Sequence, residues 1–150
     1  MQELAAAIEA SGLAGVLRAS RWIYPAVNAL HVLGVAVLVG SVAPMDLRLV
    51  GLWRRELPVA TVLRLLRPVA AAGAGLAVTT GALLFAVQAR DYVALPAFWL
   101  KMALVALGLA HALAKPRIAA ATRGRQRLAG ALSLAVWIAV LGLGRLLGYL

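Results

Sequence analysis

Long stretches without charge dominate the pattern of apolar and polar positions along this chain. Residues 22–45 and 68–89 carry no charged side chain, while residues 92–114 and 128–150 carry one each. About 20 consecutive apolar residues are enough for a helix to cross the hydrocarbon core of a bilayer. The pattern therefore predicts an all-α, integral membrane four-helix bundle that forms a single transmembrane domain over residues 1–150. We expect the four spans at about 21–45, 60–88, 95–115 and 128–149.

A shorter apolar pattern precedes the first span. Apolar residues recur at roughly helical spacing from Leu4 to Leu17, and Ser11-Gly12 interrupts them. This spacing favours a short amphipathic helix that lies on the membrane surface. Trp22 and Tyr24 follow at the position where aromatic anchors of a membrane interface are expected.

Composition agrees with a membrane protein and explains the strongly basic charge. The chain is 64% hydrophobic, its mean hydropathy is +0.94, and its formal net charge is +10. Most cations fall in two connections between spans, which predicts that residues 46–67 and 115–127 are cytoplasmic and that both termini face outward. We therefore expect membrane lipids as partners and no binding of nucleic acid. The loop cations are Arg48, Arg54, Arg55, Arg64 and Arg67 in the first connection and Lys115, Arg117, Arg123, Arg125 and Arg127 in the second.

Two further features of composition narrow the setting. The chain has no cysteine, which excludes disulfides, thiolate catalysis and cysteine metal sites. Arginine outnumbers lysine, and alanine and leucine are abundant, as is typical of proteins from GC-rich bacterial genomes. The sequence therefore predicts a bacterial inner-membrane protein. Asp46 and Arg48 are expected at the cytoplasmic boundary, where each pairs locally or with the loop.

Small residues gather on one face of the second predicted span. Gly73, Ala77 and Gly81 follow one another at four-residue spacing, which lets a neighbouring helix backbone approach closely. We interpret this face as a packing surface. The alternative is that it makes room for a flat ligand, in which case Thr79 and Thr80 hydrogen-bond to that ligand or to their own helix.

Lys101 and Arg145 are cations within predicted spans. Such a charge costs about 2.5–3.5 kcal/mol on insertion scales, so it marks a functional site or reaches the interface through its long side chain. Lys101 can extend past Trp99, and Arg145 can reach the interface or the terminal carboxylate. Helical rise places both in the outer half of the membrane at depths comparable to that of His31. Two cations facing one pocket repel unless an anion, such as a haem propionate or a lipid headgroup, lies between them.

The two histidines differ in depth. His111 lies four residues before Lys115, near the cytoplasmic surface, and roughly 12 Å or more separates it from His31 along the membrane normal. His31 is therefore the better metal-ligand candidate and His111 a weak one. His31 has two other interpretations: a hydrogen bond to a neighbouring helix, through Asn28 or a threonine of the second span, and a proton relay.

Several segments resemble known proteins. Residues 28–34, 46–51, 95–101 and 144–149, together with Gly40, resemble a family of small bacterial four-span proteins of unknown function, over nearly the whole chain. More distantly, the chain is similar to the membrane domain of the CopD group and, through Leu30-His31, Trp99-Leu100-Lys101 and His111, to HemJ-type protoporphyrinogen oxidases. The HemJ resemblance implies a b-type haem with His31 as axial ligand and Lys101 as a pocket residue. The chain departs from the HemJ pattern at residues 40–44.

These observations lead to three functional hypotheses. The first is a protein that binds haem b or a related tetrapyrrole in the outer half of the bundle, with His31 on the metal and Lys101 and Arg145 on the propionates. It would transfer electrons or oxidise a membrane-soluble substrate. The second is a non-catalytic membrane subunit or scaffold that packs through small-residue faces against a membrane protein partner or as a homo-oligomer. The weakest is CopD-like passage of a metal or solute, because the three methionines do not cluster in the sequence.

Overall fold

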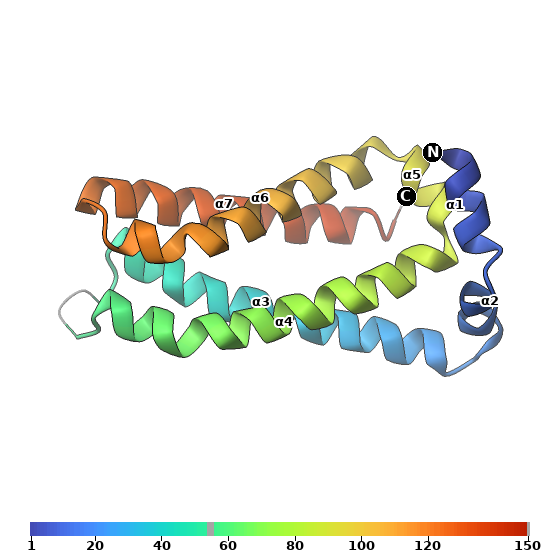
Figure 1. The fold of residues 1–150 in the computed structure, drawn as a ribbon, viewed down its shortest axis with the longest axis horizontal. Coiled ribbons are helices and arrows are strands. Elements are labelled where there is room, and N and C mark those ends of the chain that lie inside the picture. Colours follow the sequence, from blue (N-terminus) through green and yellow to red (C-terminus); the bar gives the residue numbers. More distant parts are fainter. Residues whose placement is uncertain (54–55, 150) are drawn as a thin grey trace.

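The computed structural model describes residues 1–53 and 56–149, which form helices and no strands. Four of the helices are long and apolar enough to cross a membrane. This confirms the predicted all-α fold with a four-helix membrane core (Figure 1). The four long helices are α3 (Ile23–Val50), α4 (Val59–Val87), α6 (Pro96–Ala119) and α7 (Arg123–Leu146). The short helices are α1 (Gln2–Glu9), α2 (Gly12–Ala19) and α5 (Ala89–Ala94).

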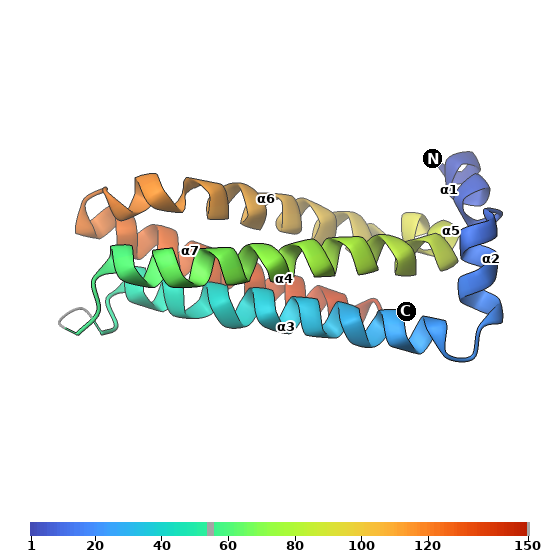
Figure 2. The same ribbon diagram turned by 60° about the horizontal axis from the view of Figure 1, so that its bottom comes forward.

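The long helices form an antiparallel bundle with two distinct ends (Figures 1 and 2). The α3–α4 and α6–α7 connections lie at one end, which we call the loop end. The N-terminus, the C-terminal segment and the three short helices lie at the other, which we call the terminal end. Helix α3 packs against α4 and α7, and α7 packs against α6, whereas α4 and α6 make few contacts with each other. The boundary between α4 and α6, the α4–α6 seam, is therefore the least closed side of the bundle.

The helices run further at the loop end than the uncharged stretches predict. Helix α3 continues from the predicted end at residue 45 to Val50, α6 continues from 115 to Ala119, and α7 begins at Arg123 instead of 128. Charged residues remain helical there because the backbone is hydrogen-bonded within the helix. The arginines of the α6 and α7 extensions are exposed, whereas Asp46 and Arg48 of the α3 extension are buried and bind other parts of the chain. Gly51 ends α3 with a φ of 130°, a conformation that glycine adopts at little cost. Arg54 and Arg55, two of the predicted loop cations, lie outside the described residues.

Glycines set the distance between α3 and α4. A Cβ added at Gly73 would lie 2.5 Å from the Leu38 nitrogen, and one added at Gly34 would lie 2.6 Å from the Ala77 nitrogen. The two backbones are therefore in direct contact, which confirms that the face with Gly73 and Ala77 is a packing surface. A Cβ at Gly81 would instead meet the His31 ring, at 3.0 Å from Cε1. The face formed by Gly73, Ala77 and Gly81 thus packs against the α3 backbone at its centre and against the His31 ring toward the terminal end.

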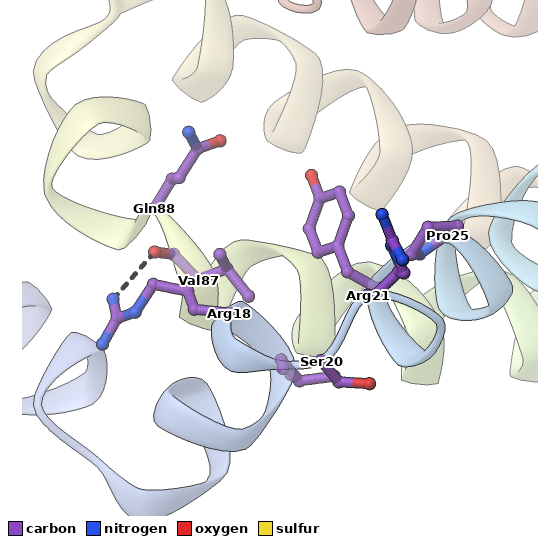
Figure 3. A pocket seen from close by; sticks show the side chains of 8 residues that line it. Arg18, Ser20, Arg21, Pro25, Val87 and Gln88 are labelled. Carbon is purple, nitrogen blue, oxygen red and sulfur yellow. Dashed lines mark hydrogen bonds between the residues drawn. The ribbon is translucent and has the colours of Figure 1, made fainter.

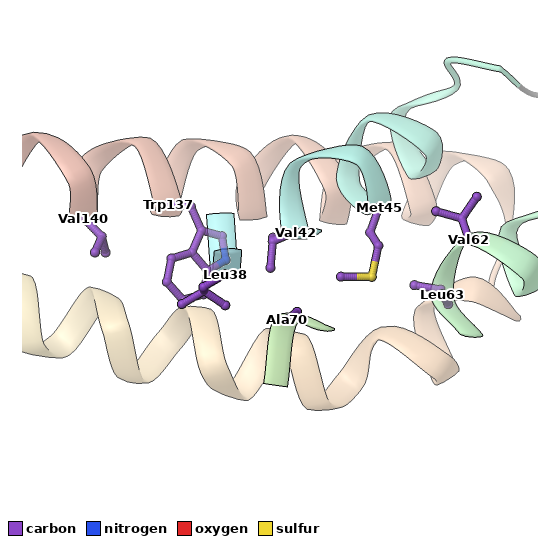
Figure 4. Packing of buried hydrophobic residues seen from close by; sticks show 8 residues of the cluster. All are labelled: Leu38, Val42, Met45, Val62, Leu63, Ala70, Trp137 and Val140. Atoms are coloured by element: carbon purple, nitrogen blue, oxygen red, sulfur yellow. The ribbon is translucent and has the colours of Figure 1, made fainter. Parts of the chain in front are cut away.

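The apolar core extends from the middle of the bundle to the loop end. Figure 4 shows side chains of α3, α4 and α7 spread along the bundle, from Trp137, which is 3% exposed, to Val62 and Leu63. His31 and Lys101 belong to no part of this cluster and lie beyond it, toward the terminal end. The cluster consists of Leu38, Val42, Met45, Val62, Leu63, Ala70, Trp137 and Val140.

The N-terminal segment crosses the terminal end of the bundle as two helices (Figure 2). The Ser11 side chain accepts a hydrogen bond from the Ala14 nitrogen and caps α2, so the predicted interruption is the start of a second helix. Arg18 donates to the Val87 carbonyl at 3.2 Å and thereby ties α2 to the end of α4. Residues 90–92, which connect α4 to α6, are helical and form part of α5.

Candidate functional site

The hydrogen bonds of His31 fix its tautomer. Its Nδ1 lies 2.9 Å from the Ala77 carbonyl oxygen and 3.2 Å from Oγ1 of Thr80, both on α4. Thr80 donates its own hydroxyl proton to the Leu76 carbonyl at 2.6 Å, so toward His31 it accepts. A carbonyl only accepts. Nδ1 of His31 therefore carries the proton and Nε2 carries the free lone pair.

The partners of His31 match one of the sequence hypotheses. A threonine of the second span was one candidate partner, and Thr80 fills that role; Asn28, the other, is exposed. Nε2 of His31 makes no hydrogen bond with any residue in 1–53 or 56–149. The imidazole is thus held by α4 through one nitrogen while the other nitrogen stays available.

Lys101 lies on the same side of the bundle as His31. Its side chain is partly buried, and its Nζ is 3.8 Å from where a Cβ on Gly144 of α7 would be. It is close enough to His31 to interact with it electrostatically. Within the described part of the chain no acid forms an ion pair with Lys101. Two of the three predicted pocket residues are therefore within electrostatic reach of each other.

Arg145 has a different local partner. Its guanidinium hydrogen-bonds the Tyr149 hydroxyl and stacks over the ring of the same residue, 4.3 Å from its centre. The side chain is exposed at the terminal end of the bundle. The alternative contact with the terminal carboxylate involves Leu150, which lies outside the described residues. Arg145 and Lys101 thus share one end of the bundle, because Gly144 on α7 lies against Lys101.

A buried ion pair forms where the sequence predicts loop charges. Nζ of Lys115 on α6 lies 2.6 Å from Oδ1 of Asp46 on α3, and the two side chains are 1% and 0% exposed. The expectations that Lys115 is a loop cation and that Asp46 pairs locally or with the loop are therefore wrong. Arg48 does interact with the loop, because its Nε donates to the Leu57 carbonyl. A buried charge needs a partner of opposite sign, and each ion supplies one to the other through the single hydrogen bond from Lys115 Nζ to Asp46 Oδ1.

Other polar side chains surround this ion pair. The Ser133 side chain on α7 lies close enough to Asp46 to interact with it, and His111 on α6 is in electrostatic reach of both ions. Yet Oδ2 of Asp46, Oγ of Ser133, and Nε2 of His111 make no hydrogen bond with another described residue. We call Asp46, His111, Lys115 and Ser133 the loop-end polar cluster.

The two histidines consequently belong to opposite halves of the bundle. His111 belongs to the cluster around Asp46, which lies 15 positions after His31 on α3, or about 22 Å at the helical rise of about 1.5 Å per residue. A single metal ion cannot bind both rings at that separation. Within residues 1–53 and 56–149, no three His, Cys, Asp or Glu side chains come together as a metal-binding group.

Sequence reasoning missed the ion pair because it treated each charge by its own span. A signal was present nonetheless: Asp46 and Lys115 lie close to the loop-end termini of α3 and α6, two helices that run in the same direction. Equal depth and opposite sign make them a natural pair. The ion pair also requires that α3 and α6 both pack against α7, and nothing in the sequence predicts that arrangement.

Two surface grooves flank the bundle. One, of about 400 Å³, lies at the terminal end between α2, the start of α3 and the end of α4, where Arg18, Arg21 and Gln88 line it (Figure 3). The other, of about 450 Å³, lies at the loop end between α4 and α6. Neither groove includes His31, Lys101 or Arg145.

Comparisons of the chain with protein-family models, with curated proteins and with solved structures found no match.

Proposed function

We propose that this protein binds haem b or a related tetrapyrrole in the terminal half of its bundle, with Nε2 of His31 as an axial ligand. The observation that carries the proposal is the Nδ1 hydrogen bond to the Ala77 carbonyl at 2.9 Å. Histidines that ligate metals commonly donate the other ring N–H to a carbonyl or carboxylate, which fixes the tautomer and orients the ring. The hydrogen bond from His31 Nδ1 to the Ala77 carbonyl gives the ring this arrangement.

The neighbouring charges support an anionic ligand. Lys101 lies partly buried near His31 without an acidic partner in the described part of the chain, and Arg145 is on the next helix at the same end. Haem carries two propionates, which cations of this kind bind through charge-assisted hydrogen bonds. In the proposal Lys101 and Arg145 hold the propionates, while Ala77 and Thr80 orient the imidazole. Bound haem supplies a one-electron redox couple, for electron transfer or for oxidation of a membrane-soluble substrate.

The proposal includes a cellular setting. The concentration of cations at the loop end supports a bacterial inner-membrane orientation in which that end is cytoplasmic. The tetrapyrrole would then lie in the outer half of the membrane, where quinone-like or porphyrin-like apolar substrates reach it from the lipid.

Absorption spectroscopy of the purified protein tests this proposal. After expression with ample haem, the wild type is expected to show a Soret band that shifts on reduction. His31→Ala is expected to lose at least nine-tenths of the band, whereas the matched variant His111→Ala keeps it, because His111 belongs to the loop-end polar cluster. A wild type without a Soret band, or a band that survives His31→Ala unchanged, would contradict the proposal.

One observation favours the scaffold hypothesis as a second candidate. Besides the buried glycines, α4 has exposed small residues, namely Ala71, Ala72, Gly75 and Ala82. A Cβ added at Gly75 meets nothing within 4 Å, so this face is free to contact another helix. If it mediates assembly, Gly75→Leu converts an oligomer into a monomer in light scattering after size exclusion. A wild type that is itself monomeric sinks this candidate.

A further inference from the structure

The loop-end groove brings two arginines to the side of the bundle that is least closed. Helix α4 contributes Leu63, Arg64, Arg67 and Pro68 to it, and α6 contributes Pro116 and Ala119. Its volume of about 450 Å³ lies within the range of pockets that hold small ligands. Because α4 and α6 make few contacts with each other, the groove opens sideways into the α4–α6 seam.

The charge of this groove is positive and not neutralised by the protein. Arg64 and Arg67 are exposed and form no ion pair or hydrogen bond with another residue that the structure describes. Lys115 lies close enough to Arg67 to interact with it, but its own charge is balanced by Asp46. Asp46 is fully buried and paired with Lys115, so within the described residues neither guanidinium has a counterion.

The backbone around the groove does not supply a competing partner. Carbonyl oxygens near the end of α6 would repel an anion, but Nε2 of Gln126 donates to those of Ala119 and Ala121, at 2.8 and 3.1 Å. These carbonyls are therefore already hydrogen-bonded. An anion that enters the groove meets the guanidiniums as its principal polar contacts.

The depth of the two arginines identifies the kind of anion. Arg67 directly precedes residues 68–89, which carry no charge, so its guanidinium lies at the boundary between the apolar span and the polar interface. Arg64 lies three residues earlier and therefore on the same face of α4. Phospholipid phosphates occupy this boundary. Ala71 and Val78 continue the face of Arg64 and Arg67 along α4, and both are exposed on the hydrocarbon side, where acyl chains lie.

We propose that the groove formed by Arg64, Arg67, Pro116 and Ala119 binds the phosphodiester headgroup of an anionic phospholipid, whose acyl chains follow the α4–α6 seam. Guanidiniums bind phosphate oxygens through paired, charge-assisted hydrogen bonds. Basic pockets between transmembrane helices are known to hold anionic headgroups. The site is separate from His31 and does not depend on the proposed tetrapyrrole.

Native mass spectrometry of the detergent-solubilised protein tests the site. The protein is titrated with dioleoyl phosphatidylglycerol, with dioleoyl phosphatidylcholine and with inorganic phosphate. We expect at least tenfold tighter binding of phosphatidylglycerol than of phosphatidylcholine, and no competition by millimolar inorganic phosphate. Equal binding of the two lipids would overturn the proposal, and so would displacement of phosphatidylglycerol by phosphate, which indicates a simple anion site.

Matched variants separate this groove from general charge attraction. Arg64→Gln/Arg67→Gln removes two cations from the groove, and Arg123→Gln/Arg125→Gln removes two exposed cations from the start of α7 at the same end. The first variant is expected to lose at least tenfold in phosphatidylglycerol affinity and the second less than threefold. Similar losses in both variants would show that net charge alone drives binding and would overturn the site.

A charge-neutral variant guards against a folding artefact. Ala60 lines the groove and is exposed, so Ala60→Trp fills the groove without replacing a buried residue. Its control is Ala131→Trp, at an exposed position of α7 outside the groove. We expect Ala60→Trp to weaken phosphatidylglycerol binding at least fivefold and Ala131→Trp to leave it unchanged, with equal helicity by circular dichroism. Unchanged binding in Ala60→Trp would overturn the location.

Discussion

At the scale of single residues, the contact with the largest energetic consequence is the ion pair between Asp46 and Lys115. Both side chains are almost inaccessible to solvent, and their 2.6 Å separation is that of a charge-assisted hydrogen bond. Desolvation of two ions costs several kcal/mol each, and their attraction compensates for this only in good geometry. Removal of one partner leaves the other as an uncompensated buried charge, whereas removal of both charges leaves no buried charge at this position.

Lys115→Met is therefore expected to destabilise the protein by about 3–5 kcal/mol. The double variant Asp46→Asn/Lys115→Met is expected to recover most of that loss, because no uncompensated charge stays in the bundle. Unfolding in mixed micelles, followed by circular dichroism, measures both effects.

Arg117→Met is the control for this prediction, because Arg117 is an exposed cation two residues further along α6. A surface change of this kind costs within about 0.5 kcal/mol. A double variant as unstable as Lys115→Met alone would show that the pair stabilises the fold through something other than charge compensation.

At the scale of helices, the closest contact is the crossing of α3 and α4. Gly34 and Gly73 let the two backbones touch, and no side chain lies between them at that point. In a membrane, helix association depends on such packing, because lipid tails are as apolar as leucine. A methyl group at the crossing has to push the helices apart, since what it meets is backbone and cannot rotate away.

Gly73→Ala is accordingly expected to destabilise the bundle by about 1–3 kcal/mol, the usual cost of overpacking. Gly75→Ala, two residues along the same helix, places its methyl group in open space and should stabilise the helix by up to about 1 kcal/mol. Thermal unfolding of both variants in the same detergent gives the comparison. Equal effects of the two alanines would contradict the backbone contact.

At the scale of the whole molecule, both predicted basic connections lie at one end and both terminal segments at the other. Because the chain has no cysteine, single cysteines report topology without a background. Thr122→Cys at the loop end is expected to resist a membrane-impermeant maleimide in intact cells, and Gln2→Cys at the terminal end is expected to react. The reverse pattern of labelling would invert the proposed orientation.

The helical bundle could be predicted from the sequence because the patterns that indicate it lie within short stretches of the chain. The uncharged stretches, the small-residue spacing at Gly73 and Ala77, and the break at Ser11 each follow from neighbours within a few turns. Helix ends were missed by up to five residues, because a charge beside an apolar stretch can belong to the helix, as Arg48 does at the end of α3 and Arg123 at the start of α7.

The polar contacts were harder to predict, because they depend on which helices face each other. Depth alone placed Lys101 and His31 at similar levels, and the structure brings them within electrostatic reach of each other. Asp46 was expected at the cytoplasmic boundary with a local or loop partner and Lys115 among the loop cations, so their buried ion pair was not predicted. The fixed Nδ1 proton of His31 required the positions of Ala77 and Thr80 on another helix, which no spacing rule within α3 supplies.

The central claim is that the ring of His31 itself ligates the metal of a bound tetrapyrrole, and chemical rescue tests it most directly. His31→Gly removes the imidazole and leaves space for free imidazole to enter. The account predicts that His31→Gly, supplied with haem, lacks the wild-type Soret band and regains it when millimolar imidazole is added. A wild-type spectrum in His31→Gly without imidazole would contradict the account.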